Sequence, residues 1–140
     1  MSKEALIEAL NKDLANEYQA IVMYTTYSAA VKGSARLQLV DFFQSEIPDE
    51  QGHAQYLADK IVALGGVPTT TPAPVPSAET PREMLERVLE AEKKAVEGYS
   101  ARSEQAKEAG ELGLAIQLED MIVDETGHYE ETKKLLDEWS

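Results

Sequence analysis

The sequence predicts an all-α protein: a four-helix bundle built from two repeated helical hairpins, with a long crossover between the second and third helices. Three observations lead to this prediction. Apolar residues recur three and four positions apart along four long segments, which is the period of a helix face. A proline-rich segment separates the chain into two halves. The two halves then carry the same polar residues at a constant spacing.

The four helices are expected at about residues 3–31, 34–64, 80–109 and 111–139. Ser34 is expected to cap the second helix, because a serine side chain can accept a hydrogen bond from a free amide of the first turn. Thr80, Pro81 and Glu83 supply the third helix with a capping residue, a proline at its first position and the acid of a capping box. Pro48 falls inside the second helix, where it removes a backbone hydrogen bond and is expected to kink or bulge the helix.

The connection between the hairpins, residues 66–79, holds four of the six prolines. Such a segment favours extended polyproline II structure, and about twelve residues at ~3.1 Å each reach nearly ~40 Å. A helix of about thirty residues is about 45 Å long, so the connection can follow the bundle and make the second and third helices parallel. A flexible linker between two domains is the alternative, but neither hairpin alone could bury its apolar face. One domain is therefore expected over residues 1–140, with hairpins at about 3–65 and 80–139.

The composition excludes several kinds of protein. The net charge is −13 and no basic stripe is present, so nucleic acid is not expected as a partner, whereas an acidic surface attracts cations. The absence of cysteine excludes disulfides, thiolate metal sites and iron–sulfur clusters. No apolar run is long enough to cross a membrane, and the first residues are too acidic for a secretory signal. A cytoplasmic protein without a membrane partner is expected.

The same acidic pentapeptide occurs twice, as DEQGH at 49–53 and DETGH at 124–128, and these copies contain the only two histidines. The copies are 75 residues apart. The same offset pairs Glu17 with Glu92, Tyr24 with Tyr99, Glu50 with Glu125, and His53 with His128. Each half therefore carries a Glu and a Tyr two turns later on its first helix, followed by Glu-x-Gly-His on its second. This agreement indicates an internal duplication of a helical hairpin.

Six of these repeated residues fall on the apolar faces of the four helices: Glu17, Glu50, His53, Glu92, Glu125 and His128. The midpoint of Glu17 and Glu50 falls at the turn of the first hairpin, so their side chains are expected at the same height of the bundle. Burying an unpaired carboxylate costs several kcal/mol, so either some of the carboxylates are protonated or cations lie among them. Two divalent metal ions would balance four glutamates. Carboxylates with one imidazole per metal suit iron or manganese, and zinc less specifically.

A Glu on each of two helices and a Glu-x-x-His on each of the other two resembles the ferritin-like di-iron carboxylate proteins, and most closely the bacterioferritin and rubrerythrin domains. The resemblance covers essentially the whole chain and implies a ferritin-like bundle with two iron ions. It implies that Glu17 and Glu92 are terminal ligands, Glu50 and Glu125 bridges, and His53 and His128 one terminal ligand per metal. Tyr24 and Tyr99 resemble the family's tyrosines that hydrogen-bond ligand carboxylates, although tyrosines packed in the core are the alternative. Together with the bridges they are the candidate catalytic residues.

The sequence also departs from the named branches of this family. Bacterioferritins place a haem-binding Met where this chain has Gln51 and Gly52, so no haem is expected. Rubrerythrins carry a second Glu one turn after the third-helix ligand, where this chain has Ala95. The chain stops at Trp139 and Ser140 without the fifth helix of some ferritin cages. Dps-type proteins build their metal site between subunits, whereas here one chain supplies every ligand.

The resemblance implies a ferroxidase-type oxidoreductase that oxidises Fe(II) with O₂ or H₂O₂ and serves in iron detoxification or storage. A rubrerythrin-like peroxide reductase with an external electron donor and a non-catalytic metal-binding or assembly protein are the alternatives. Tyr27, Phe42 and Tyr56 lie off the metal-facing side of the first hairpin, where they could cover a partner's matching hairpin or pack within the subunit. A homodimer is predicted, with a twelve-subunit shell as the alternative. Glu46 has Met121 as its counterpart. It is an acid near the ligands, a point of metal access, an alternative ligand or a solvated charge.

Overall fold

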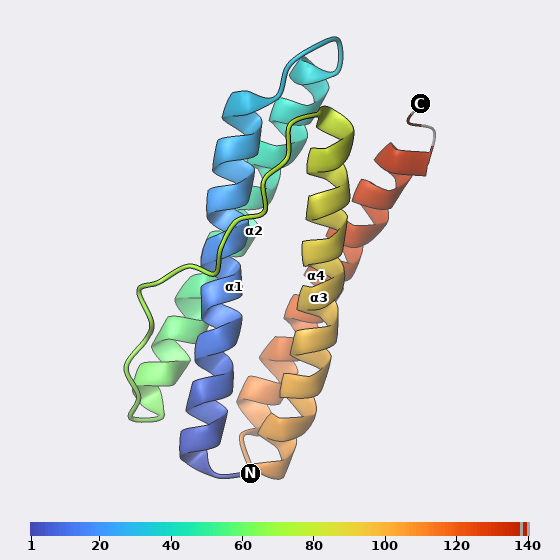
Figure 1. The fold of residues 1–140 in the computed structure, drawn as a ribbon. Helices are drawn as coiled ribbons and strands as arrows, with labels where there is room; N and C mark the ends of the chain where they lie inside the picture. The colour runs from blue at the N-terminus through green and yellow to red at the C-terminus, as the bar shows by residue number, and fades with distance from the viewer. Residues whose placement is uncertain (138, 140) are drawn as a thin grey trace.

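The computed structural model describes residues 1–137 and 139, and these residues form four helices and no strand. The helices are α1 Lys3–Ala30, α2 Arg36–Ala63, α3 Pro81–Glu108 and α4 Leu112–Asp137 (Figure 1). The prediction of an all-α four-helix bundle is confirmed, with helix ends that differ by a few residues. The expected end of the fourth helix, Trp139, lies beyond α4, and Glu138 is outside the described residues. Within the described part of the chain, none of the helices combines the length and the apolar character that crossing a membrane requires.

The long crossover runs along α1 from the end of α2 to the start of α3, so α2 and α3 point in the same direction (Figure 1). Asn11 holds its first part, because its side-chain amide donates to the Val67 carbonyl at 3.1 Å and its carbonyl oxygen accepts from the Thr69 amide at 2.8 Å. Further along, the Tyr27 hydroxyl donates to the Pro76 carbonyl at 2.6 Å. The crossover is therefore bonded to the first hairpin at both of its ends.

The start of α2 differs from the prediction. Ala35 is the residue before the helix and makes no side-chain capping bond, so the expected cap at Ser34 is wrong. The physical reason lies in its neighbours. Gly33 turns the chain with a φ of 95°, a conformation that glycine adopts without strain. The guanidinium of Arg36 then turns back to donate to the Val31 carbonyl at 2.7 Å, so this loop is organised around the end of α1 instead.

The start of α3 is as predicted, whereas the kink or bulge expected at Pro48 stays a prediction. The Thr80 hydroxyl accepts a hydrogen bond from the Glu83 amide at 3.1 Å, and Pro81 occupies the first turn of α3, as predicted. α2 continues through Pro48 without interruption. Tolerance of a proline in mid-helix requires that neighbouring groups accommodate the lost backbone bond.

The buried side chains form two apolar clusters with a polar layer between them. One cluster joins the first half of α1, the second half of α2, the end of α3 and the start of α4, and contains Leu10, Leu57 and Leu118. The other joins the second half of α1, the first half of α2 and the start of α3, and contains Met23 and Phe43. The repeated Glu and His residues lie between these clusters along every helix. The two apolar clusters therefore enclose the polar layer from both ends of the bundle.

The surface proposed for a dimer is partly used within the subunit. Tyr27 is only 5% exposed and lies beneath the crossover that it bonds. Phe42 and Tyr56 are half-buried and pack against different apolar clusters. Tyr27 therefore packs within the subunit, which was one of the two alternatives for these three side chains.

Candidate metal centre

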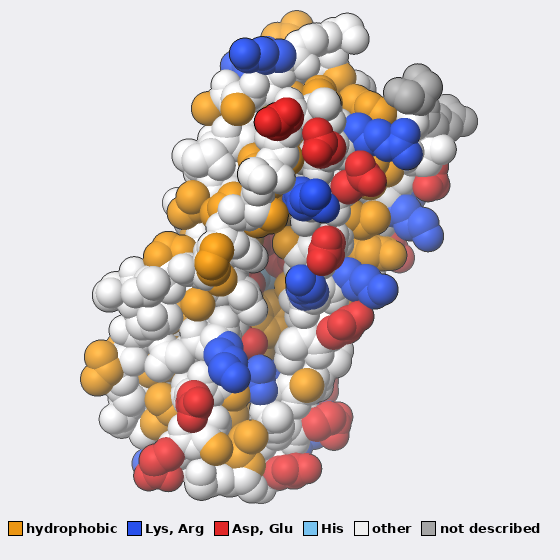
Figure 2. All heavy atoms as spheres, viewed as in Figure 1, with side chains coloured by type: hydrophobic (Ala, Val, Ile, Leu, Met, Phe, Trp, Pro, Cys, Tyr) orange, Lys and Arg blue, Asp and Glu red, His pale blue; other side chains and the backbone are white. Residues whose placement is uncertain are grey.

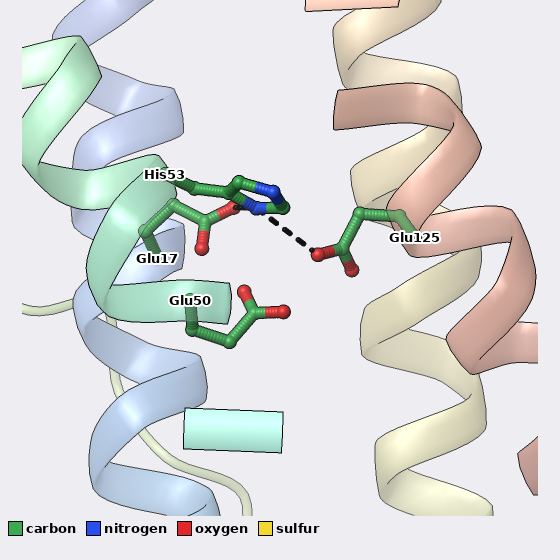
Figure 3. A group of neighbouring side chains, drawn as sticks. All are labelled: Glu17, Glu50, His53 and Glu125. Atoms are coloured by element: carbon green, nitrogen blue, oxygen red, sulfur yellow. Dashed lines mark ion pairs between the residues drawn. The ribbon is translucent and has the colours of Figure 1, made fainter. Parts of the chain in front are cut away.

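The six repeated ionisable residues converge in the polar layer, with contributions from all four helices. α1 supplies Glu17, α2 supplies Glu50 and His53, α3 supplies Glu92, and α4 supplies Glu125 and His128. None of them is more than 9% exposed. Figure 3 shows the side chains of Glu17, Glu50 and His53 facing Glu125 across the bundle. The convergence predicted from the helix faces is present.

One group of these side chains surrounds His53. Its Nδ1 atom lies 3.3 Å from Glu125 Oε1, the contact dashed in Figure 3, and 3.6 Å from Glu17 Oε1. Glu17, Glu50, His53 and Glu125 each offer one ligand atom, and these atoms all lie within 4.8 Å of one another. This spacing suits a single metal ion held by three carboxylates and one imidazole.

A second group surrounds His128. Its Nδ1 atom lies 3.4 Å from Glu50 Oε1, 3.7 Å from Glu125 Oε1 and 3.9 Å from Glu92 Oε2. Glu125 is thus within 4 Å of both imidazoles. Glu50 belongs to the group around His53 and also faces His128. The two carboxylates expected to bridge lie between the two histidines.

Several buried polar atoms in this layer have no hydrogen-bond partner among the described residues: Glu17 Oε2, Glu46 Oε2, Glu50 Oε1, His53 Nδ1, Glu125 Oε1 and His128 Nδ1. Each such group costs about 1–3 kcal/mol, and more when it is charged. Their chemistry is that of a metal site, because carboxylate oxygens and imidazole nitrogens are ligands for iron, manganese and zinc. The residues therefore fit a pair of divalent ions, whose charge balances four glutamates.

Two of the buried acids, Glu50 and Glu92, have raised pKa values. Burial, reinforced by the nearby Glu125 charge, raises the pKa of Glu92 to about 8 although the Thr132 hydroxyl favours its charged form. Burial and the Glu17 carboxylate raise the pKa of Glu50 well above its ordinary range. Without a metal ion, protons on these carboxylates replace part of the missing positive charge.

The two histidines also hold protons, because the carboxylates around them stabilise the charged imidazolium. Burial lowers the pKa of His53, but its close contacts with the carboxylates of Glu125 and Glu17 outweigh burial and raise the value to about 11. Burial likewise lowers the pKa of His128, and its contacts with Glu46 and Glu125 raise it to about 9. A metal ion that binds the imidazoles must therefore displace protons from them.

Hydroxyl groups hold the two carboxylates on α1 and α3. The Tyr99 hydroxyl donates to Glu17 Oε1, and the Tyr24 hydroxyl lies 3.4 Å from Glu92 Oε2. Each repeated tyrosine thus contacts the glutamate of the other hairpin. Thr132 donates to Glu92 Oε1 at 2.6 Å, a contact that the sequence did not reveal because Thr132 lies outside the repeated pattern.

Two aspartates hold the outer nitrogens of the histidines. His53 Nε2 lies 2.9 Å from Asp124 Oδ2, and His128 Nε2 lies 3.1 Å from Asp49 Oδ2. Neither aspartate was among the residues predicted from the sequence to form the site. Their signal was present, because they are the first residues of the two pentapeptide copies. A carboxylate on the outer nitrogen fixes the ring and makes its other nitrogen a better metal ligand.

Glu46 also belongs to the polar layer. It is 8% exposed, and its Oε2 atom lies 2.6 Å from His128 Nε2. The alternative of a solvated charge is therefore wrong. Glu46, Glu92 and His128 offer ligand atoms that lie within 4.8 Å of one another.

A small cavity reaches this layer between α1 and α3. Its volume is about 50 Å³, and its lining includes Glu17, Glu50, Glu92 and Glu125. Its outer lining includes Lys94, which also lines an open groove beside the crossover. The surface in Figure 2 is hollowed along this side of the molecule. The cavity has room for a few water-sized molecules next to the carboxylates.

Comparison with known proteins gives consistent matches. The model of the family described as Ferritin-like domain matches residues 7–140. A bacterioferritin from Rhodobacter capsulatus is 30% identical over 124 residues, which are 88% of this chain and 77% of that protein. A solved structure of ferritin-like, di-iron carboxylate proteins from Bacillus anthracis is 52% identical, with a TM-score of 0.95 over 98% of this chain and 100% of that one. A dodecameric thioferritin from Bacteroides fragilis shares the fold at 23% identity and a TM-score of 0.83, over 97% and 86% of the two chains.

Proposed function

The chain belongs to the ferritin-like domain family, and on that premise we propose that it binds iron in pairs and oxidises Fe(II) to ferric iron with O₂ or H₂O₂. Iron detoxification or storage would be the purpose of this reaction. The single observation that carries the proposal is the set of unpartnered, buried carboxylate and imidazole atoms in one layer of the bundle. The likeness to the di-iron carboxylate proteins of B. anthracis supports the pairing.

We assign the ligands as the resemblance implied. Glu17 and His53 would hold one ion, Glu92 and His128 the other, and both ions would share Glu50 and Glu125. The Nδ1 atoms are the metal-binding nitrogens in this assignment, because they face the expected ligand glutamates. The Nε2 atoms face other acids, Asp124 at His53 and Asp49 with Glu46 at His128. Iron, manganese and zinc all accept this donor set, and iron is the proposed native metal.

The residues around the ligands would control the reaction. Tyr24 and Tyr99 keep their protons, because burial raises their pKa values well above the ordinary range, so both can donate to terminal carboxylates. The cavity between α1 and α3 would admit the oxidant, since it lies against all four glutamates. Bound iron supplies the electrons in this scheme. Two Fe(II) ions lose one electron each, and one H₂O₂ takes up both electrons and two protons to give two waters.

Two finer points remain proposals as well. We propose that no haem is bound, because Gln51 and Gly52 occupy the expected position and are exposed. For assembly, burial of Tyr27 weakens the case for the homodimer, and the fold occurs as a dodecamer in B. fragilis. A twelve-subunit shell is therefore the preferred assembly. Light scattering separates the two, since a mass near two chains contradicts the shell.

The function is tested by adding two Fe(II) ions per chain without oxygen and then supplying H₂O₂ or O₂. Ferric absorbance and oxidant consumption are recorded, and the account expects rapid oxidation with one H₂O₂ consumed for every two Fe(II). Turnover that requires an added electron donor would indicate a peroxide reductase. Iron binding without any oxidant consumption would indicate a non-catalytic metal-binding protein.

A further inference from the structure

The two halves of the bundle differ at one buried position beside the metal centre. Glu46 in the first half is 8% exposed, and the residue at the same place in the second half, 75 positions later, is Met121 at 0%. A fully buried Met contributes apolar packing, whereas a buried Glu requires a counter-charge or hydrogen-bond donors. The duplication is therefore not symmetric in charge.

The difference appears in the contacts of the two imidazoles. The outer nitrogen of His53 has one carboxylate partner within reach, Asp124 Oδ2 at 2.9 Å. The outer nitrogen of His128 has two, Glu46 Oε2 at 2.6 Å and Asp49 Oδ2 at 3.1 Å. An imidazole that binds a metal ion through Nδ1 retains one N–H, at Nε2, which can serve one acceptor well. One of the two acids at His128 is then left without a hydrogen bond from the ring.

Burial decides what it costs to leave either acid without the N–H. The Asp49 side chain is 54% exposed, close to the 50% of its counterpart Asp124, so water can satisfy whatever His128 does not. The Glu46 side chain is 10% exposed, and its Oε2 atom has no contact in hydrogen-bond geometry besides the 2.6 Å ion pair with His128 Nε2, which Asp49 shares. If Asp49 accepts the N–H as Asp124 does at His53, the Glu46 carboxylate needs a cation. Glu92 and His128 offer ligand atoms within 4.8 Å of it.

We propose that Glu46 is a seventh protein ligand, specific to the metal position held by Glu92 and His128. This inference rests on the proposed function, since it assumes that the paired site binds metal. The position with Glu46 carries an additional carboxylate and takes up the first divalent ion. The position of Glu17 and His53 lacks that carboxylate and fills second. The two ions are therefore bound with unequal affinity despite the duplicated ligands.

Mn(II) tests this order because it suits the same ligands and its position can be read from anomalous scattering. Full-length protein is crystallised with one and with two Mn(II) per chain, and Mn(II) affinity is measured in solution by calorimetry. With one equivalent, the wild-type peak is expected mainly between Glu92 and His128, with a Glu46 oxygen bonded to the ion. Glu46→Gln should lower the affinity for the first Mn(II) by about ten- to hundred-fold, the range seen when supporting groups of metal sites are removed. It should also distribute one equivalent evenly over both positions.

Two further variants make the test decisive. Asp41→Asn removes an exposed acid from the same helix and should leave the order of filling unchanged. Met121→Glu adds the missing acid to the second half. It should raise the Mn(II) affinity of the position of Glu17 and His53, so that the two affinities become similar. Two bound Mn(II) ions with Glu46 still against the His128 ring, or an unchanged order in Glu46→Gln, overturns this inference alone. Absence of Mn(II) from the whole layer overturns both this inference and the proposed function.

Discussion

His53 of α2 and Asp124 of α4 lie 2.9 Å apart, so the second hairpin holds the histidine of the first. The relationship is reciprocal, because Asp49 of the first hairpin lies 3.1 Å from His128 of the second. Neither histidine receives its outer carboxylate from its own half. Docking of the two hairpins therefore completes the orientation of both imidazoles at once.

Replacement of Asp124 by Asn should weaken metal binding without unfolding the protein. The Asp124 side chain is half exposed, so its substitution disturbs little packing, but His53 loses the carboxylate that orients its ring. Loss of such a partner reduces metal affinity by about 10–100-fold. Calorimetric titration with Mn(II) measures the change. Asp120→Asn, an exposed acid one turn earlier on α4, is the matched control and should bind as the wild type does.

Glu50→Ala or Glu125→Ala should abolish binding of the metal pair. Each change removes a carboxylate that lies between the two histidines, which leaves the charge of one metal ion unbalanced. Metal analysis after gel filtration should find at least one ion fewer per chain. Glu8→Ala and Glu104→Ala change exposed acids and should retain the full content. Retention of two ions by all four variants would show that the ligands have been assigned wrongly.

Metal-free protein should lose stability as the pH rises. The folded state keeps a proton on Glu92 up to a pKa of about 8, whereas the unfolded chain releases it near 4.5, so this stabilisation disappears between those values. His128 acts in the same direction, since its contribution is complete below its ordinary pKa of 6.5 and is lost as the pH passes about 9. The thermal midpoint without metal should therefore fall from about pH 6 to about pH 8.5.

Bound metal should reverse this trend, because the ions replace the protons and bind more tightly as the protons leave. At a free concentration about 100 times the Kd, a ligand adds about 2.7 kcal/mol to the stability of the native state. The difference in midpoint with and without excess Mn(II) should widen as the pH rises. Identical midpoints with and without the metal at every pH would argue against a buried site.

Arg102→Met should destabilise the bundle away from the metal centre. Arg102 on α3 forms a 2.8 Å ion pair with Asp13 on α1, which is 5% exposed. Removal of the guanidinium leaves a buried carboxylate without its partner, and such changes cost about 3–5 kcal/mol. Urea unfolding measures the loss. A double variant that also changes Asp13 to Leu should recover part of it, because no unpaired charge then remains.

The sequence was sufficient for the features that depend on periodicity and repetition. Glu17 and His53 could be placed in the core because they interrupt apolar faces at helical spacing, and Thr80 with Pro81 marked the start of a helix through local chemistry. Features that depend on contacts between distant residues were not accessible in the same way. The burial of Tyr27 depends on the path of the crossover, which the sequence did not determine in detail.

The same limit explains what was missed near the metal centre. Ser34 was a reasonable cap by residue type, but the contact of Arg36 with the end of α1 defined the loop. The role of Asp124 depends on which hairpin faces which histidine, and that is decided by packing of the two halves. Glu46 could be placed on the buried face, yet its proximity to His128 required the positions of α2 and α4.

The central claim is that one chain holds two metal ions within its own four helices. An anomalous-difference map of crystals loaded with Fe(II) without oxygen, collected at the iron absorption edge, tests it most directly. The account predicts two iron peaks per chain, roughly 3.5–4 Å apart as in other two-metal sites, between Glu50 and Glu125. A single peak, peaks between neighbouring chains, or iron found only on the surface would contradict it.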